Sequence, residues 1–455
     1  MNATNSMKAS GKMIAVGLTA LLLAGGIAAA QEAKAPASQP AAGAPVSDAA
    51  TAAANGLVPV KTLRHDDLKD PKTGQNAWVN KSPGSSAVVI HDKWVYAAST
   101  GEYVLQFERD PNTGGLEFRD AVSFEHHDPE AFAFINYLFI ARSASGKAFL
   151  YLQRGSHNPP LNAVYAIDPT TGKLMLAHKM IDKARPNPFW GVITPDQKRI
   201  YSVSGKTIAW YKIEEDGSPS EEGKVETKVD SSVFLLSPDG RHLYTDRSYM
   251  GNKGVVSVNA YALDEMTGKP TFVDTYAVDL SRGSSMTGFS PDGKHLYVFN
   301  AHMGYHKNWP KGDLGAILER DPGTGALKVV WSGTTEPALH GIGGQAGFGG
   351  ELTGLLKFTA DGTRGVAIGL RADGLNTYPS FLSVFTRDPK TGKLTVEASV
   401  PAYDEARNGR WTANFVACKL AMDPKACVFY TVGWDISSYK LPAAGKAEAP
   451  QERAR

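Results

Sequence analysis

The residues best suited to acid–base chemistry are concentrated in polar segments that separate β-rich runs. Six of the eleven histidines lie in such segments, namely His126, His127, His157, His302, His306 and His340. An imidazole or a carboxylate can take a proton from water, and an arginine can stabilise the negative charge that then develops. We therefore expect hydrolytic or ligand-binding chemistry in these segments.

Hydrolysis needs a base that activates water and a cation or donor that stabilises the oxyanion. The candidate bases are His127, Asp128, His157, His340 and Glu351. The candidates for substrate binding and charge stabilisation are Arg154, Arg247, His302, Arg371 and Arg410. No spacing singles out one pair among them. The chain lacks a Gly-x-Ser-x-Gly motif, a phosphate loop, a dinucleotide fingerprint and a zinc-protease motif, which disfavours those chemistries.

Two histidine pairs raise the alternative of a metal site. His302 and His306 stand four residues apart, and His126 and His127 are adjacent. Converging imidazoles could hold copper or zinc. However, the residues between His302 and His306 do not favour a helix, and neighbouring side chains on an extended chain point apart. We interpret these residues as solvated loop histidines, and we expect neither a metal nor an organic cofactor.

Two turn motifs alternate along the chain and predict its fold. The first is of the type Asp-Pro-x-Thr-Gly and follows a β-rich run, at 108–118, 166–176, 213–223, 262–272, 319–329 and 386–396. The second is of the type Ser-Pro-Asp-Gly, at 143–150, 194–201, 237–244, 290–297 and 359–366. Asp accepts bonds from the backbone ahead of it, Pro fixes φ, and Gly supplies a positive φ, so each motif closes a hairpin. His242 and His295 lie in these stereotyped turns, and we expect them to be structural.

The constant phase of turn, strand and loop gives four strands per unit, which is the pattern of propeller blades. We expect an all-β fold with six blades at about 85–124, 132–181, 189–229, 232–279, 285–333 and 351–400. Three strands of a seventh blade are expected at about 412–421, 427–432 and 434–441. The strand-like residues 58–63 would complete that blade and hide the edges of the ring. The 385 residues from 57 to 441 give 55 per blade, which leaves six or eight blades open.

The turns and strands of the middle units resemble the seven-bladed lactonase family, the 6-phosphogluconolactonase-type propellers. The resemblance rests on SPDGRHLY (237–244), SPDGKHLY (290–297), VSVNAYALDEMTGKPTFVDTYAV (256–278) and LSVFTRDPKTGKLTVEASV (382–400). It covers the third to sixth units well and the first, second and seventh weakly. It implies a seven-bladed propeller that hydrolyses a lactone ring, as a carboxylic-ester hydrolase, without a bound organic cofactor.

The start of the chain predicts export. Lys8 and Lys12 precede an apolar run from Met13 to Ile27, and Ala28-Ala29-Ala30 fits the small-residue rule for cleavage before Gln31. Residues 31–56 are rich in Ala, Pro and Ser and predict a flexible linker. We therefore divide the chain into a signal peptide (1–30), a linker (31–56), a propeller (57–441) and a disordered tail (442–455). A periplasmic or secreted location follows.

Charge and cysteine content exclude several partners. With 48 basic and 46 acidic residues the net charge is only +2, so nothing draws the protein to nucleic acid or an anionic membrane. No apolar stretch after the signal peptide is long enough to span a bilayer. Cys418 and Cys427 flank Met422-Asp423, the expected turn of a hairpin, and an exported protein would allow a disulfide between them. Two free thiols remain the alternative.

Two classes of function stay open at this stage. One is an exported lactonase-like hydrolase that acts on a small, sugar-type lactone at the mouth of the central channel. The other is a non-catalytic propeller that binds a glycan or a cell-envelope protein through loop aromatics: Tyr249, Tyr305, Trp309, Tyr378, Tyr403 and Trp411. We expect a monomer in both cases, because a closed ring leaves no open sheet edge.

We predict that the mature protein begins at Gln31. Mass spectrometry or N-terminal sequencing of the protein recovered from its native host measures this directly. A start at Met1, Met7 or Met13 would contradict the predicted signal peptide.

Overall fold

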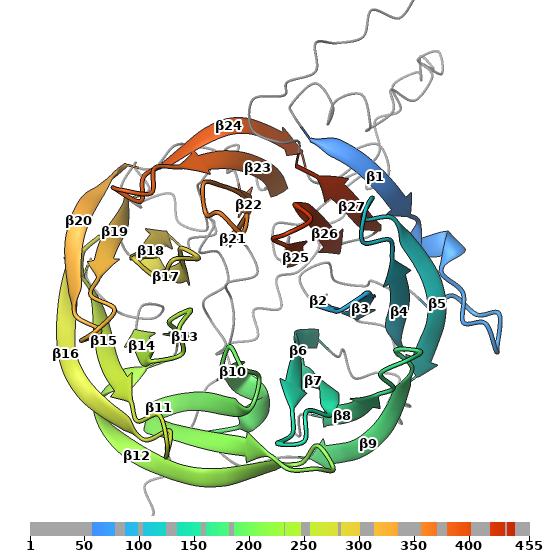
Figure 1. Cartoon of the computed structure of the whole chain (residues 1–455), viewed down its shortest axis with the longest axis horizontal. Helices are drawn as coiled ribbons and strands as arrows, with labels where there is room; N and C mark the ends of the chain where they lie inside the picture. The colour runs from blue at the N-terminus through green and yellow to red at the C-terminus, as the bar shows by residue number, and fades with distance from the viewer. Residues whose placement is uncertain are drawn as a thin grey trace, which may run out of the picture. The chain divides into compact units, whose positions relative to one another are not determined.

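The structure is a computed structural model, and it describes fourteen stretches of the chain. They are residues 57–77, 87–98, 103–123, 134–155, 161–181, 186–231, 233–246, 255–280, 284–300, 314–334, 356–370, 380–401, 419–432 and 435–441. The compact unit Ser47–Arg455 contains all of them and is described by itself. Its strands form seven antiparallel sheets around a ring, as Figure 1 shows.

The seven sheets are the predicted blades. Blades one and two consist of β2 (Ala87–His91), β3 (Trp94–Ala98), β4 (Tyr103–Arg109), β5 (Leu116–Ser123), β6 (Phe134–Arg142), β7 (Ala148–Gly155), β8 (Leu161–Ile167) and β9 (Leu174–Ile181). Blades three and four consist of β10 (Gly191–Ile193), β11 (Arg199–Ile213), β12 (Pro219–Ser231), β13 (Val233–Leu236), β14 (His242–Asp246), β15 (Val255–Leu263) and β16 (Pro270–Asp279). Blades five and six consist of β17 (Ser284–Phe289), β18 (His295–Asn300), β19 (Leu314–Arg320), β20 (Leu327–Thr334), β21 (Leu356–Phe358), β22 (Arg364–Leu370), β23 (Ser380–Arg387) and β24 (Leu394–Pro401).

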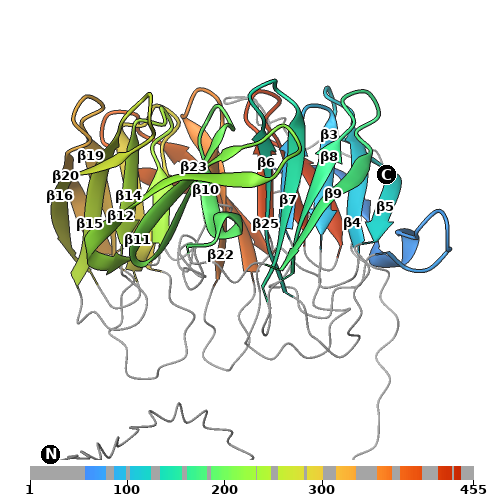
Figure 2. The ribbon, with the colours of Figure 1, turned by 90° about the horizontal axis from the view of Figure 1, so that it is seen from below.

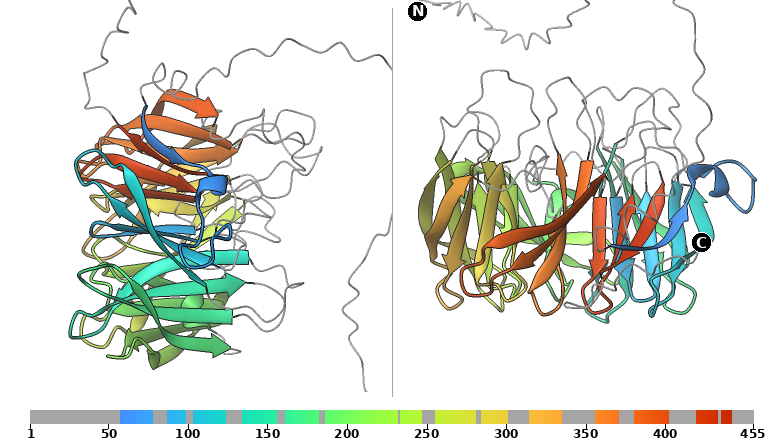
Figure 3. Two further views of the ribbon diagram at one scale, coloured as in Figure 1. Left: turned by 90° about the vertical axis from the view of Figure 1, so that its right-hand side faces the viewer. Right: turned by 90° about the horizontal axis from the view of Figure 1, so that it is seen from above.

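The last blade joins the two ends of the propeller. It consists of β25 (Lys419–Asp423), β26 (Val428–Val432), β27 (Ile436–Lys440) and β1 (Val58–Leu63), in the order β1-β27-β26-β25. Val58 pairs with Lys440 and Leu63 with Ile436, so β1 is the outer strand of this blade, labelled beside β27 in Figure 1 and visible as the blue strand next to the red ones in Figure 3. The predicted closure and the count of seven blades are therefore confirmed, and rings of six or eight blades are excluded.

Blade three departs from the predicted four separate strands. β11 runs for 15 residues and pairs with β10 through 200–202 and with β12 through 205–213. The second stretch begins at Gly205, whose φ is +58°. β11 thus occupies both places that the second and third strands take in other blades. The only helices among the described residues are single 3-10 turns, η1 (His65–Asp67) and η3 (Pro188–Trp190), in line with the expected scarcity of helix.

The stereotyped turns behave as their sequence predicts. In the turn at 168–172 the Asp168 carboxylate accepts hydrogen bonds from the backbone N–H groups of Thr170 and Thr171, and the turn ends on Gly172 at a φ of +66°. These backbone donors lower the pKa of the Asp168 carboxyl below its usual value. Figure 2 shows the short turns together along one edge of the ring, which we call the turn face.

A tyrosine joins each of five blades to the next blade across the turn face. The tyrosine lies on the second strand, or in blade three on β11, and its hydroxyl donates to the carbonyl of the glycine in the next blade's turn, at 2.6–2.9 Å. The five pairs are Tyr96 with Gly172, Tyr151 with Gly217, Tyr201 with Gly268, Tyr244 with Gly325 and Tyr297 with Gly392. All five side chains are fully buried. A Cβ on Gly172 would lie 2.3 Å from the ring of Trp94, so the close approach of the blades also needs glycine there.

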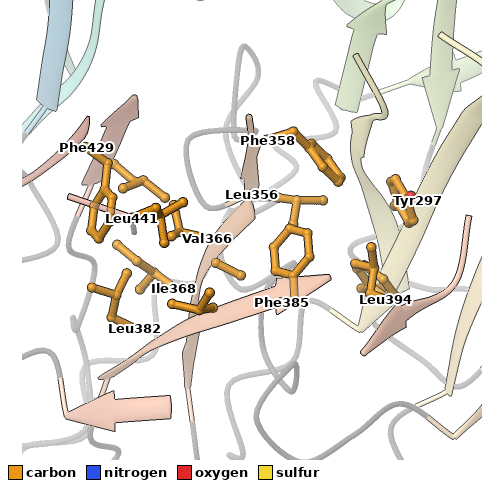
Figure 4. Packing of buried hydrophobic residues seen from close by; sticks show 14 of the residues in the cluster. Tyr297, Leu356, Phe358, Val366, Ile368, Leu382, Phe385, Leu394, Phe429 and Leu441 are labelled. Atoms are coloured by element: carbon orange, nitrogen blue, oxygen red, sulfur yellow. The ribbon is translucent and has the colours of Figure 1, made fainter. Parts of the chain in front are cut away.

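Blade six breaks this rule for a topological reason. Val366 occupies the place of the tyrosine, two residues after Arg364, and blade seven has no hairpin turn between its third and fourth strands because β1 comes from the other end of the propeller. A tyrosine here would have no glycine carbonyl to bind. Instead Val366 belongs to one buried cluster with Phe429 of β26 and with Leu441, which follows β27 (Figure 4). Leu57, just before β1, belongs to the same cluster.

The hydrophobic core therefore lies between blades rather than within them. Six clusters of buried side chains each combine residues of neighbouring blades. One example joins Phe149 and Tyr151 of blade two to Phe189, Ile200 and Ala209 of blade three. Burial of this surface is the main favourable contribution to folding, and a blade obtains it only from its neighbours.

We predict that Tyr151→Phe destabilises the propeller by about 1–3 kcal/mol, because the carbonyl of Gly217 loses its donor in a buried place. Chemical denaturation measures the change. Tyr276→Phe is the control: Tyr276 is half-buried in β16, and no hydrogen bond links its hydroxyl to the described part of the chain. Equal losses in the two variants would contradict a specific role for the Tyr151 hydroxyl.

Candidate functional site

The ring has two chemically different faces. At the edge opposite the turn face, the second strand ends and the third strand begins in each blade that has four strands. The outer strand of a blade also ends at this edge, and the chain leaves it there for the next blade. We call this opposite edge the loop face. Residues such as Gly155, Asp246 and Leu370, which end β7, β14 and β22, lie at this edge.

The predicted site residues belong to segments that connect to the loop face. His127 and Asp128 come between β5 and β6, His157 between β7 and β8, His340 and Glu351 between β20 and β21, and Arg410 between β24 and β25. Arg247, His302 and Arg371 follow the ends of β14, β18 and β22 by one or two residues. All nine lie outside the described residues, so their assignment as catalytic or substrate-binding groups stays a prediction. The same holds for the loop aromatics and for His126 and His306.

Arg154 is the one candidate of this set whose backbone is described. It pairs with Ile135 of β6 and Leu161 of β8, one residue before the end of β7. Its backbone is thus fixed by the ladder on both sides at the loop-face end of blade two. Its side chain is not among those described.

The described polar groups near the loop face are mostly tied into the fold. The Asp246 carboxylate is fully buried and accepts a hydrogen bond of 3.0 Å from the backbone N–H of Met286, which links blades four and five. The hydroxyl of Tyr211 donates to the carbonyl of Pro186, and Ser202 Oγ donates to the carbonyl of Asn187, both at 2.7 Å. These bonds hold the segment that enters blade three against its sheet.

The turn face carries the clusters that look most like an active site by charge alone. Arg320 of blade five donates to Asp239 in the turn of blade four at 2.7 Å and lies 2.7 Å from Nδ1 of His242, the first residue of β14. The side chain of Arg320 is 1% exposed. Arg387, Asp292 and His295 repeat this arrangement between blades six and five.

The pKa values of these groups are shifted by their mutual contacts. Burial, followed by the charge of Arg320, lowers the pKa of His242, so its Nδ1 is free to accept from the guanidinium. Burial alone would raise the pKa of Asp239, but hydrogen bonds from Ser237 and Arg320 bring it below its usual value. Shifted pKa values often mark functional sites, but structural ion pairs produce them too.

The recurrence of the ion pair decides between a functional and a structural role. Arg109 of blade one makes the corresponding ion pair with Asp423 of blade seven, so the Arg–Asp pair occurs at three separate interfaces and the histidine at two of them. A catalytic group is needed once, whereas an interface contact recurs with the interface. We conclude that the clusters join blades and that His242 and His295 are structural, as predicted.

No group of three or more His, Cys, Asp or Glu side chains in the described stretches is arranged to hold a metal ion. The candidate histidine pairs lie outside these stretches, and the expectation about metals stays untested for them. Within the same stretches, no helix is long and apolar enough to cross a membrane.

The hairpin of the two cysteines turns at a different place from the predicted one. Met422 and Asp423 belong to β25 and pair with Phe429 and Val428, so the turn comprises residues 424–427. The expected turn at Met422-Asp423 was therefore wrong by about two residues, and Cys427 lies in the turn itself, at a φ of +53°. Cys418 precedes β25 and lies outside the described residues, so the Cys418–Cys427 disulfide stays a prediction.

Two sets of residues escaped the sequence reasoning. The arginine before three of the Asp-Pro turns (Arg109, Arg320, Arg387) was not recognised as the partner of an Asp in the preceding blade. The buried amides Gln153 and Asn162 at the loop-face end of blade two were also missed. Aligning the seven units with one another would have found both sets, because the arginine recurs at the same place in three units and the two amides stand where three other units have apolar residues.

The fold defines the class of protein as a seven-bladed β-propeller. It has distant structural similarity to two proteins described as "putative 6-phosphogluconolactonase", from Bacteroides uniformis and Bacteroides fragilis. The first is 20% identical, with a TM-score of 0.48 over 69% of this chain and 84% of that chain. The second is 19% identical, with a TM-score of 0.47 over 72% and 88%. A protein from Lactobacillus plantarum is 16% identical, with a TM-score of 0.47 over 69% and 85%.

The comparisons by sequence add no relative. No protein-family model matches the chain, and no curated protein matches it.

We predict that stability falls as the pH drops below about 6.5, the usual pKa of an unfolded histidine. The folded protein holds the pKa of His242 and His295 below that value, so the unfolded chain binds protons first and acid favours unfolding. Replacing both residues by Asn, which offers an oxygen near Nδ1 but does not titrate, should flatten the profile. Thermal unfolding at pH 7.5 and 5.5 measures it. The groups facing His242 are Arg320, Asp239, Arg241 and Asp321. The same slope in both proteins would contradict the prediction.

Proposed function

We propose that this protein is an exported lactone hydrolase that opens a small, sugar-type lactone at the loop face, near the mouth of the central channel. The proposal combines the resemblance of the repeats to the lactonase-type propellers with the placement of the candidate residues. The observation that carries it is the connectivity of the blades. The ten candidates (His127, Asp128, Arg154, His157, Arg247, His302, His340, Glu351, Arg371 and Arg410) belong to segments joined to the same end of the strands.

The turn face offers no comparable place for the reaction. Its Arg, Asp and His side chains are paired with one another across blade interfaces, as in Arg320 with Asp239 and His242. Its tyrosine hydroxyls donate to glycine carbonyls, and burial raises the pKa of Tyr244 to about 12, so this hydroxyl stays protonated near neutral pH and has no free site to take a proton from water. This supports the loop face as the place for chemistry that needs a free base.

Lactone opening fits the residue types of these segments. A histidine or carboxylate such as His127, His340 or Glu351 would take a proton from the attacking water. An arginine such as Arg247 or Arg371 would stabilise the oxyanion and bind the carboxylate of the product. The mechanism needs no covalent nucleophile and no organic cofactor, which agrees with the lack of a nucleophile-elbow motif in the sequence.

Export limits the substrate in this proposal. A phosphorylated lactone of central sugar metabolism is made in the cytosol, whereas a protein with a signal peptide meets its substrate outside it. We therefore favour an unphosphorylated sugar lactone, met in the periplasm or outside the cell.

A lactone-hydrolysis panel tests the proposal, read as acid release in a pH-stat with the spontaneous rate subtracted. We predict activity with at least one sugar lactone and a loss of about 10²-fold or more in His127→Ala or His340→Ala. His178→Ala is the matched control, since His178 lies on the outer strand β9 beside Asp216 of the next blade. Unchanged rates in both test variants would remove these residues from the mechanism. A panel without any activity would refute the hydrolase, and a glycan array would then test the non-catalytic binding propeller.

A further inference from the structure

Two buried amides of blade two have no hydrogen-bond partner among the residues that the structure describes. Gln153 of β7 and Asn162 of β8 are directly opposite each other in the ladder, and both are 0% exposed. Within the described stretches neither the nitrogen nor the oxygen of either amide has a partner, so four polar atoms of one cross-strand pair are unsatisfied there. Leaving such atoms unpaired away from water costs free energy, and native proteins rarely tolerate it without a reason.

In three other blades, apolar residues occupy the positions that correspond to Gln153 and Asn162. Gln153 stands two residues after Tyr151, and the corresponding pairs of blades one, six and seven are apolar: Ala98 with Val104, Ile368 with Leu382, and Val432 with Ile436. The fold therefore does not need amides here. In blade four the same place holds Asp246, but its carboxylate is used to bind the backbone of Met286 in the next blade.

The amides face the interface between blades two and three. Tyr151 and Val164 pack against Phe189, Ile200 and Ala209 of blade three. Gln153 lies two residues along the strand from Tyr151, and Asn162 two residues from Val164, so their side chains leave the sheet on the same side.

The described residues of blade three do not supply the missing partners. η3 packs against β7, and the ring of Phe189 lies 5.4 Å from that of Tyr151. The carbonyls of Pro186 and Asn187 in this segment accept bonds from Tyr211 and Ser202 instead.

The pair lies at the loop-face end of the blade. β7 ends at Gly155 and β8 begins at Leu161, so Gln153 and Asn162 are within two residues of the strand ends. Together two primary amides offer donors and acceptors side by side and carry no charge. This combination matches a ligand that has both hydroxyl and carbonyl or ether oxygens.

We propose that Gln153 and Asn162 are binding residues for a neutral, oxygen-rich small molecule of the sugar-lactone class at the loop-face end of the interface between blades two and three. This assignment rests on the proposed function for its ligand class. The amides hold the ring by its hydroxyl and carbonyl oxygens, whereas the chemistry is left to the bases and arginines of the neighbouring segments. Specificity follows, because a ligand that lacks one of these oxygens leaves a buried amide unpaired.

The test uses the full chain and the neutral lactam of gluconic acid, D-glucono-1,5-lactam, which keeps the carbonyl and hydroxyls but does not hydrolyse. Isothermal titration calorimetry measures its binding to the wild type and to Gln153→Met/Asn162→Leu. We expect the double variant to bind at least tenfold more weakly. It should nevertheless have an equal or higher Tm, because apolar groups replace unsatisfied amides. The single variants Gln153→Met and Asn162→Leu serve if the double variant does not fold.

Gln106→Met is the matched control. Gln106 is equally buried in blade one, but its Nε2 donates to the carbonyl of Thr171 at 2.7 Å. The same change of side chain should therefore lower the Tm and leave lactam affinity unchanged. A crystal structure of the wild type with the lactam should place ligand oxygens within hydrogen-bond distance of Gln153 and Asn162.

The outcomes separate this inference from the proposed function. Hydrolysis of sugar lactones with unchanged lactam affinity in the double variant, or with only water at the amides in the crystal, overturns the inference and leaves the hydrolase. Lactam binding that depends on the amides, without any hydrolysis, supports the inference and overturns the hydrolase. A wild type that neither binds the lactam nor hydrolyses lactones overturns both.

Discussion

The structure depends on contact between neighbouring blades. A single four-stranded blade cannot bury its own faces, so its apolar side chains are removed from water only when the next blade covers them. The hydrogen bond from a buried tyrosine to a turn glycine fixes how closely two blades approach, as in Tyr297 with Gly392. The short turn motifs are therefore contact surfaces as well as hairpin closures.

The closure of the ring is governed by the same need for contact. Blade seven takes its outer strand from the other end of the propeller, so it lacks the turn that would accept a tyrosine. Val366, Leu57 and Leu441 belong to the apolar cluster of this interface, and the backbone N–H of Ala360 donates to the carbonyl of Pro424. On the other side of blade seven Asp423 binds Arg109 of blade one, which adds an ion pair to the apolar cluster of that interface. Because β1 pairs along five positions with β27, the ends of the propeller are held together by backbone hydrogen bonds as well.

The periodic features of the fold could be predicted from the sequence, and the exceptions could not. Each turn motif acts locally through its own Asp, Pro and Gly, so blade boundaries and the closing strand followed from spacing. The merged strand β11 and the turn that contains Cys427 depart from the repeat that the other units share. The pairing of Arg320 with Asp239, 81 residues away, depends on how one blade meets its neighbour. The candidate site was predicted only as a face, because non-repeating segments carry no internal pattern that fixes one side chain against another.

Comparison of the seven blades with one another separates structural residues from candidates for a chemical role. A residue type that recurs at successive interfaces, such as Arg320 and Arg387 with their Asp and His partners, is explained by the contact between blades. Gln153 and Asn162 have no such explanation. This polar pair of blade two has apolar counterparts in three other blades, and its amides make no hydrogen bond to the described residues. In a repeat protein, the internal copies thus serve as the reference state for one another. A departure that costs stability without joining two blades points to a ligand.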